Sequence, residues 1–136
     1  MENKDTFVEK LRSSGLRPTK QRLEICKVLY NRKKTFHLTI EELSKIHKKN
    51  SKESISLATI YNTVHAFKNK NYLKEISINL NKSYFDTNVS THHHFFNENT
   101  HELIDLKNTD VGEIKIKKKI PGKKIKSVEV LVKISS

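Results

Sequence analysis

Three consecutive histidines, His92, His93 and His94, are the residues of this chain best suited to chemistry. Neutral imidazole is the commonest protein ligand for zinc, iron and related metals. Side chains two residues apart on a β-strand point to the same face, so His92 and His94 would lie together if this segment is extended. The histidine run therefore predicts a metal or haem site.

A hairpin would bring a carboxylate to the same face. The Asn- and Thr-rich residues 97–100 separate two segments that contain apolar residues, so we expect the turn there. That turn would pair Phe96 with His101 and His92 with Asp105. Asp105 would then share a face with the first and third histidines of the run, and the middle histidine would lie on the opposite face.

The expected cluster thus holds His92, His94 and Asp105, and a second carboxylate is close in sequence. Asp86 precedes His92 by six residues and could fold back over the same face. Imidazoles with carboxylates make a hard to borderline site, which suits Fe(II), Mn(II) or Zn(II) better than Cu(I). The alternative is a polar strand segment beside a surface acid, with no metal.

Apolar residues at three- and four-residue steps predict four helices before the histidines. Gly15 is expected to end the first helix, and Thr19 to cap the second. Thr39 with Glu42 forms a capping box for the third. The predicted helices run over residues 5–14 and 20–30, from Thr39 onward, and from about Ser56 onward.

After Asn71 the period changes to two residues, which is typical of strands. We expect strands over residues 72–78 and 82–86, joined by a turn that contains Asn79 and Asn81. Short helices followed by a two-stranded wing predict a winged-helix DNA-binding domain over residues 1–86.

The remaining residues predict a hinge over 87–91 and a smaller domain over 92–136. Its expected elements are a hairpin at about 92–106, a short helix near 110–119 and a strand from Lys126 to Ile134. This region is below the size at which a single core is usually sufficient, and its last strand would leave an apolar edge. We therefore expect an α+β protein whose C-terminal α/β domain pairs with a copy of itself in a homodimer.

The chain is strongly basic, with 27 Lys and Arg against 15 Asp and Glu and a formal charge of +12. This excess favours a polyanionic partner such as double-stranded DNA. Cys26 is the one cysteine, so the chain cannot form an internal disulfide or a structural zinc clamp of four cysteines. Cys26 is expected in the core. With no apolar run of membrane-spanning length and no signal-peptide pattern, we expect a soluble cytoplasmic protein.

Several segments resemble the ferric uptake regulator (Fur) superfamily. They are Gly15–Arg22, Ser56–Thr63, Tyr84–Asn88 and the triple histidine. The run from Thr91 to Phe96 followed by His101–Asp105, with no CxxC pair, is similar to the iron response regulator (Irr) branch. The resemblance covers nearly the whole chain. It implies a winged-helix domain followed by an α/β dimerisation domain, and transcriptional control linked to iron or haem.

The resemblance also implies ligands. Fur proteins hold their regulatory metal with a histidine before the third helix, an acid at the end of the wing, an HxH pair and an acid on the next strand. The matching residues here are His37, Asp86, His92, His94 and Asp105. In the Irr branch a triple histidine is associated with haem, so His92, His93 and His94 are also candidate axial ligands. The chain lacks the CxxC cysteines of a structural zinc and a Cys-Pro haem motif, since Cys26 precedes Lys27.

On the DNA side, the resemblance implies that the fourth helix enters the major groove, where Tyr61 would contact bases. A place in the core is the alternative for this tyrosine. Short polar residues of the same helix could reach phosphates or base edges, and basic residues near the second helix could clamp the backbone or enter an A/T-rich minor groove. The expected DNA-contacting residues are Arg17, Lys20, Arg22, Ser56, Thr59, Tyr61 and Asn62.

Two other functions fit the same histidines and acids. A peroxide sensor could hold Fe(II) at the five metal ligands, and oxidation of that iron would damage a ligand histidine. A small non-haem metalloenzyme could use the HxH pair with a carboxylate, but the chain offers little apolar lining for a substrate pocket near the histidines. We therefore expect an iron- or haem-responsive transcriptional regulator, not an enzyme.

Overall fold

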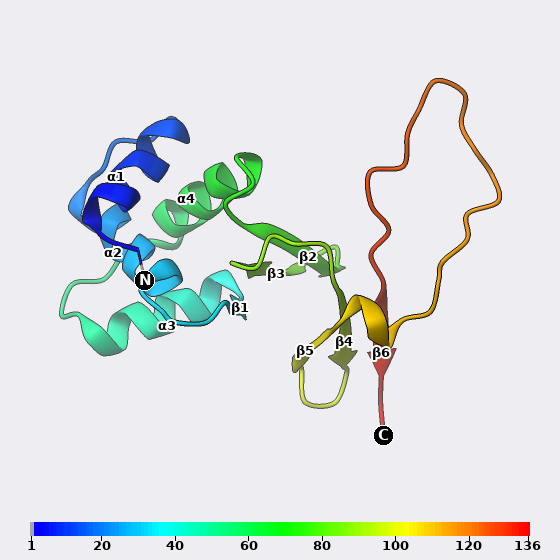
Figure 1. Cartoon of the computed structure of the whole chain (residues 1–136). Helices are drawn as coiled ribbons and strands as arrows, with labels where there is room; N and C mark the ends of the chain where they lie inside the picture. Colours follow the sequence, from blue (N-terminus) through cyan, green and yellow to red (C-terminus); the bar gives the residue numbers. More distant parts are fainter. Residues whose placement is uncertain (1) are drawn as a thin grey trace. The chain divides into compact units, whose positions relative to one another are not determined.

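The computed structural model describes residues 2–136 and divides into two compact units. The first unit ends at Val89 and the second begins at Ser90. Helices α1 to α4 and a small sheet make up the first unit, and another small sheet lies in the second (Figure 1). The α+β class predicted from the sequence is confirmed. No helix within residues 2–136 is long and apolar enough to cross a membrane.

Capping side chains set where the helices of the first unit begin. Among the described residues the helices are α1 (Lys4–Ser13), α2 (Lys20–Tyr30), α3 (Ile40–Asn50) and α4 (Leu57–Asn69). Thr19, Thr39 and Ser56 each accept a hydrogen bond from the backbone N–H of the third residue of their helix. Gly15, with a φ of +79°, turns the chain after α1. The predicted starts of α2, α3 and α4 are confirmed.

The sheet of the first unit has the strand order β1-β3-β2, with antiparallel neighbours. Its strands are β1 (His37–Leu38), β2 (Lys74–Asn79) and β3 (Lys82–Asp86). The predicted wing hairpin is present, but β2 begins at Lys74 instead of Tyr72. The Tyr72 N–H still bonds to the carbonyl of Phe67 at 2.9 Å, and Asn71 has a φ of +61°. These residues form the turn that ends α4, so they cannot also pair in β2.

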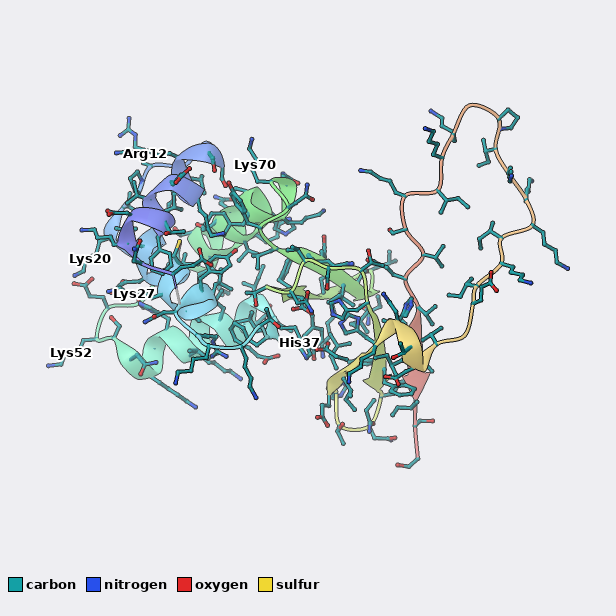
Figure 2. All side chains as sticks on the ribbon, viewed as in Figure 1. Arg12, Lys20, Lys27, His37, Lys52 and Lys70 are labelled. Atoms are coloured by element: carbon teal, nitrogen blue, oxygen red, sulfur yellow. The ribbon has the colours of Figure 1, made fainter. Side chains whose placement is uncertain are left out.

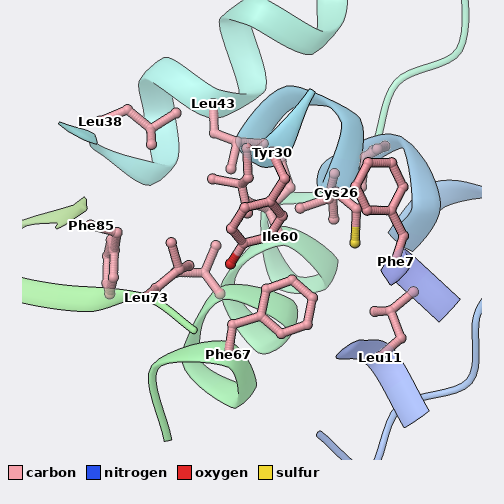
Figure 3. Close-up of a cluster of buried hydrophobic side chains, with 14 residues drawn as sticks. Phe7, Leu11, Cys26, Tyr30, Leu38, Leu43, Ile60, Phe67, Leu73 and Phe85 are labelled. Atoms are coloured by element: carbon pink, nitrogen blue, oxygen red, sulfur yellow. The ribbon is translucent and has the colours of Figure 1, made fainter. Parts of the chain in front are cut away.

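A hydrophobic core fills the first unit (Figure 3). Phe67 on α4 is fully buried, and its ring lies 6.0 Å from the rings of both Tyr30 and Tyr72. The Tyr30 hydroxyl donates to the Tyr72 carbonyl at 2.9 Å, which satisfies a polar group inside the core. Cys26 packs in the same cluster, as predicted, and burial raises its pKa to about 12. The thiol therefore stays protonated at neutral pH and is unsuited to bind metal.

The central strand of the second sheet carries two of the three histidines. β4 (His93–Asn97) lies between β5 (Leu103–Leu106), which is antiparallel, and β6 (Leu131–Ile134), which is parallel to it (Figure 1). The strand expected from Lys126 is therefore shorter than predicted. Its pairing with β4 begins at Leu131, opposite His94, close to the residue where β4 itself begins.

The predicted helix near residues 110–119 is wrong. A short 3-10 turn, η1 (Asn108–Asp110), follows β5, and residues 111–130 of the described chain form a long loop with no helix or strand (Figure 1). Ile114 and Ile116 alternate with lysines, and this two-residue spacing gives a helix no apolar stripe to bury. Gly112 lowers the helix propensity of the segment further.

Candidate metal centre and nucleic-acid interface

The hairpin of β4 and β5 sets which carboxylate faces the histidines. His94 lies directly opposite Asp105, so the predicted register, which paired Asp105 with His92, is wrong by two residues. The loop includes His101, whose φ is +60°, and closes where the carbonyl of Glu102 accepts a hydrogen bond from the last residue of β4 at 2.9 Å. A shift of two residues leaves every side chain on its predicted face, because strand side chains alternate.

Two histidines and an aspartate of the second unit form a cluster. Nε2 of His94 is 3.1 Å from Oδ1 of Asp105, and Nε2 of His92 is 3.6 Å from the same oxygen. The two imidazole rings are 4.4 Å apart. Nδ1 of His92 is 2.8 Å from the carbonyl of Ser90. A carbonyl only accepts, so Nδ1 carries the proton and Nε2 of the neutral ring carries the lone pair that a metal requires.

The middle histidine of the run has a different partner. Nδ1 of His93 accepts a hydrogen bond from the backbone N–H of Val130 at 2.9 Å. The neutral ring therefore carries its proton on Nε2. This bond ties β4 to the chain just before β6, so His93 stabilises the second sheet from the face opposite His92 and His94.

A second histidine and aspartate lie together in the first unit. The pairing of β1 with β3 places His37 opposite Asp86, and Nδ1 of His37 is 3.9 Å from Oδ2 of Asp86. Asp86 is buried, and its Oδ1 accepts a hydrogen bond from the Asn88 N–H at 2.8 Å. The His37 and Tyr84 rings meet in a T-shaped contact, with centroids 5.9 Å apart. A buried carboxylate is unfavourable unless it has a polar partner, and the Asn88 N–H supplies one.

Each unit thus presents imidazole nitrogen close to carboxylate oxygen. The strands β1 and β3 supply His37 and Asp86, and the β4–β5 hairpin with the residue before it supplies His92, His94 and Asp105. These nitrogen and oxygen donors fit Fe(II), Mn(II) or Zn(II). The strand β1, which is too short to show a period, is the element that sequence reasoning missed in positioning His37.

The exposed face of α4 presents the candidate for base contact. Ile60 is fully buried, whereas the Tyr61 side chain is 53% exposed, so Tyr61 does not belong to the core. Next to it, Asn62 is exposed. Ser56 and Thr59 are partly used locally, because Ser56 caps α4 and the two hydroxyls lie 2.9 Å apart. The α4 surface therefore offers an aromatic ring with short polar groups beside it.

Basic side chains surround the helices of the first unit, and several of them project outward in Figure 2. Lys20 forms a salt bridge with Glu53 at 3.4 Å, with both side chains largely exposed. The Arg22 guanidinium donates to the carbonyl of Arg17 at 3.1 Å, which joins the two predicted DNA-clamping arginines at the start of α2. Exposed pairs of this kind cost little to rearrange, so these cations can turn toward phosphate.

Comparisons with known proteins agree with this arrangement. Residues 13–134 match the model of the ferric uptake regulator family. The peroxide-responsive repressor PerR of Staphylococcus aureus is 31% identical over 107 residues, which cover 79% of this chain and 70% of that protein.

Solved structures of ferric uptake regulators share the fold. The ferric uptake regulator of Pseudomonas aeruginosa with manganese aligns with a TM-score of 0.68 at 19% identity, over 96% of this chain and 97% of that chain. The ferric uptake regulator of Vibrio cholerae aligns with a TM-score of 0.69 at 21% identity, over 95% of this chain and 98% of that chain.

Proposed function

The chain belongs to the ferric uptake regulator family, and from this we propose that it is a metal-responsive, DNA-binding transcriptional regulator without enzymatic activity. The observation that carries the proposal is the cluster of His92, His94 and Asp105 in a chain that also holds a winged helix. A histidine whose tautomer is fixed by a backbone carbonyl is typical of a metal ligand, since the bond orients the ring and directs Nε2.

The proposed effector is a divalent ion, Fe, Mn or Zn. Its ligands are His37, Asp86, His92, His94 and Asp105. The donor chemistry supports this, because imidazole nitrogens and carboxylate oxygens suit such ions. A bound ion would balance the negative charge of the carboxylate that holds it and would fix the orientation of the imidazoles.

The proposed partner is an A/T-rich double-stranded operator, bound by a homodimer. Tyr61 would contact bases, with support from its exposure on α4. Short polar residues would reach phosphates or base edges, and the basic residues would bind the backbone. The proposed contacts besides Tyr61 are Arg17, Lys20, Arg22, Ser56, Thr59 and Asn62.

Tyr61→Ala tests the DNA-binding role. A duplex selected from a random library by metal-loaded protein serves as the specific probe, and a scrambled duplex as the reference. We expect Tyr61→Ala to reduce discrimination between them by roughly 1 to 3 kcal/mol, because a good base contact contributes that much. Affinity for both duplexes should fall steeply with salt, since cationic contacts release counterions. Fluorescence anisotropy at several salt concentrations measures both effects.

Tyr61→Phe is the matched control, because it keeps the ring that packs on a thymine methyl and should retain most of the discrimination. Chelation of the metal should change the affinity of the wild-type protein for the selected duplex. The proposed interface would be contradicted if wild type and Tyr61→Ala discriminated equally between the two duplexes, or if DNA affinity did not change with salt concentration.

The effector has two finer candidates, each with its own support. Haem, as in the Irr branch, is favoured by the triple histidine, with Phe95 and the buried Phe96 directly after it as apolar residues. Coordination through Nδ1 of His93 would displace the Val130 hydrogen bond, so haem binding there would loosen β6. A peroxide response is favoured by the relative in Staphylococcus aureus, which is a peroxide-responsive repressor.

One set of titrations separates these effectors. If haem is the effector, ferric haem should give a shifted Soret band that is lost when His92, His93 and His94 are all replaced by alanine. Operator DNA should then weaken haem affinity by the factor by which haem weakens DNA binding. If peroxide is the effector, peroxide-treated, iron-loaded protein should gain oxygen on a ligand histidine, seen by mass spectrometry. A Soret shift that persists in the triple variant would remove the haem candidate.

A further inference from the structure

Three rings of the first unit form a continuous stack that ends at the predicted base-reading residue. The His65 ring lies 4.0 Å from the Tyr61 ring at an interplanar angle of 38°. The His65 ring also makes a T-shaped contact with the Phe85 ring, at 5.5 Å and 76°. Solvent exposure falls along the stack, from Tyr61, which is 53% exposed, through the half-buried His65 to the buried Phe85. His65 thus separates the exposed ring from the core.

The secondary structure explains why the stack is ordered. Tyr61 and His65 are four residues apart on α4, a spacing that places side chains next to each other on one helical face. Phe85 lies on β3, the central strand, where it pairs with Leu38 of β1 and Glu75 of β2. A buried residue held by strands on both sides is a fixed support, so the position of the His65 ring is set by the sheet and by the helix together.

We propose that His65 is a positioning residue for DNA recognition, which holds the Tyr61 ring in one orientation before DNA arrives. This inference rests on the proposed function, in which Tyr61 contacts bases. An exposed tyrosine that is not held samples several rotamers, and fixing it on binding costs free energy. A ring packed beneath it removes part of that cost in advance. Tyr61 and His65 also line one groove together with residues of α3 and of the wing, so the held ring faces an open surface.

In this stack His65 acts as a planar aromatic ring that is large enough to contact both Tyr61 and Phe85. Its contact with Tyr61 is a close, tilted stack, and its contact with Phe85 is edge-to-face. Both geometries are favourable for aromatic rings and need no charge. Phenylalanine at this position can therefore replace histidine in the stack, whereas alanine leaves a gap between Tyr61 and Phe85.

Two measurements on the full-length protein test the proposal. The first is the NMR chemical shift of the Tyr61 ring protons without DNA, which reports the ring stacked at 4.0 Å. His65→Ala should move these shifts toward random-coil values, and His65→Phe should keep them displaced. The second is discrimination between selected and scrambled duplexes. We expect His65→Ala to lose about 2- to 10-fold, the range expected for one aromatic pair, and His65→Phe to lose less than 2-fold.

A double-mutant cycle distinguishes positioning from general weakening. In a Tyr61→Ala background, His65→Ala should have no further effect on discrimination, because the residue it positions is gone. An equal loss in both backgrounds would overturn the proposal, as would Tyr61 ring shifts that are unchanged by His65→Ala. Thermal unfolding of each variant shows whether it is folded. If His65→Ala does not fold, His65→Phe supplies the test. A loss of discrimination of more than 10-fold in folded His65→Phe would also overturn the proposal. If the wild-type protein selects no duplex at all, the proposed function itself fails, which is a separate result.

Discussion

Replacing His94 with alanine should lower the affinity of the protein for divalent metal by more than about 100-fold. Removing a residue that only hydrogen-bonds to a metal ligand commonly lowers metal affinity by about 10- to 100-fold, and removing a ligand itself should cost more. His94 is central to the cluster, with its Nε2 3.1 Å from Asp105 and its ring 4.4 Å from that of His92. It is also buried, so water enters its place less readily than at an exposed ligand. Competition titration of Mn(II) and Zn(II) against a chromophoric chelator measures the change.

His93→Ala is the matched control for this prediction. It removes a neighbouring histidine whose Nδ1 bonds to Val130 on the opposite face, so it should weaken the sheet but leave metal affinity within a few-fold of wild type. Cys26→Ser should also leave metal affinity intact, because the thiol is buried and its pKa is raised to about 12, mainly by burial. If all three variants bind metal equally well, the cluster is a structural feature of the hairpin only.

Phe67→Ala should lower the free energy of unfolding of the first unit by about 3 to 5 kcal/mol, the usual cost of removing a large buried aromatic side chain. Phe67 is fully buried, and it contacts the rings of Tyr30 and Tyr72. The change would leave a cavity beside a polar hydroxyl, that of Tyr30. Urea denaturation followed by far-ultraviolet circular dichroism reports this unit, because all α-helices of the described chain lie in it.

Phe67→Leu keeps most of the apolar volume and should cost considerably less than Phe67→Ala. Small and equal losses for both variants would mean that the core collapses around the missing ring. A loss near the full stability of a small domain, which is about 5 to 15 kcal/mol, would mean that the winged helix unfolds at room temperature in Phe67→Ala.

The helices and the wing were the most predictable parts of the fold, because their signals are local. Thr19, Thr39 and Ser56 each cap a helix in the structure, and a capping residue acts on a backbone N–H only three residues away. The expected helix near residues 110–119 is wrong for the opposite reason. Its isoleucines alternate with lysines, and this pattern has no helical face to pack against a core.

The candidate site was predictable by face but not by register. Because strand side chains alternate, the grouping of His92 and His94 with Asp105 survives the two-residue error in pairing. The error itself arises in the loop, where His101 adopts a positive φ that the sequence does not signal, since such residues are mostly Gly, Asn or Asp. The hydrogen bond between His93 and Val130 joins distant segments and has no sequence signature.

The ring stack around His65 is only partly predictable from the sequence. Its spacing of four residues from Tyr61 is visible in the sequence and predicts that the two rings are neighbours. The third ring, Phe85, comes from β3, and only the tertiary fold brings it beneath α4. A pair on one helix is therefore readable from the sequence, whereas a stack that crosses from helix to sheet is not.

The parallel pairing of β6 with β4 has a consequence for the order in which the protein folds during synthesis. His93 and Val130, which join these segments, are 37 residues apart, so their hydrogen bond cannot form until the chain has been synthesised beyond Val130. The winged helix and the β4–β5 hairpin precede β6 in the chain and so leave the ribosome earlier. A nascent chain therefore passes through a stage with a folded DNA-reading unit and an unfinished histidine sheet, and it gains its full response to the effector only when β6 has been made.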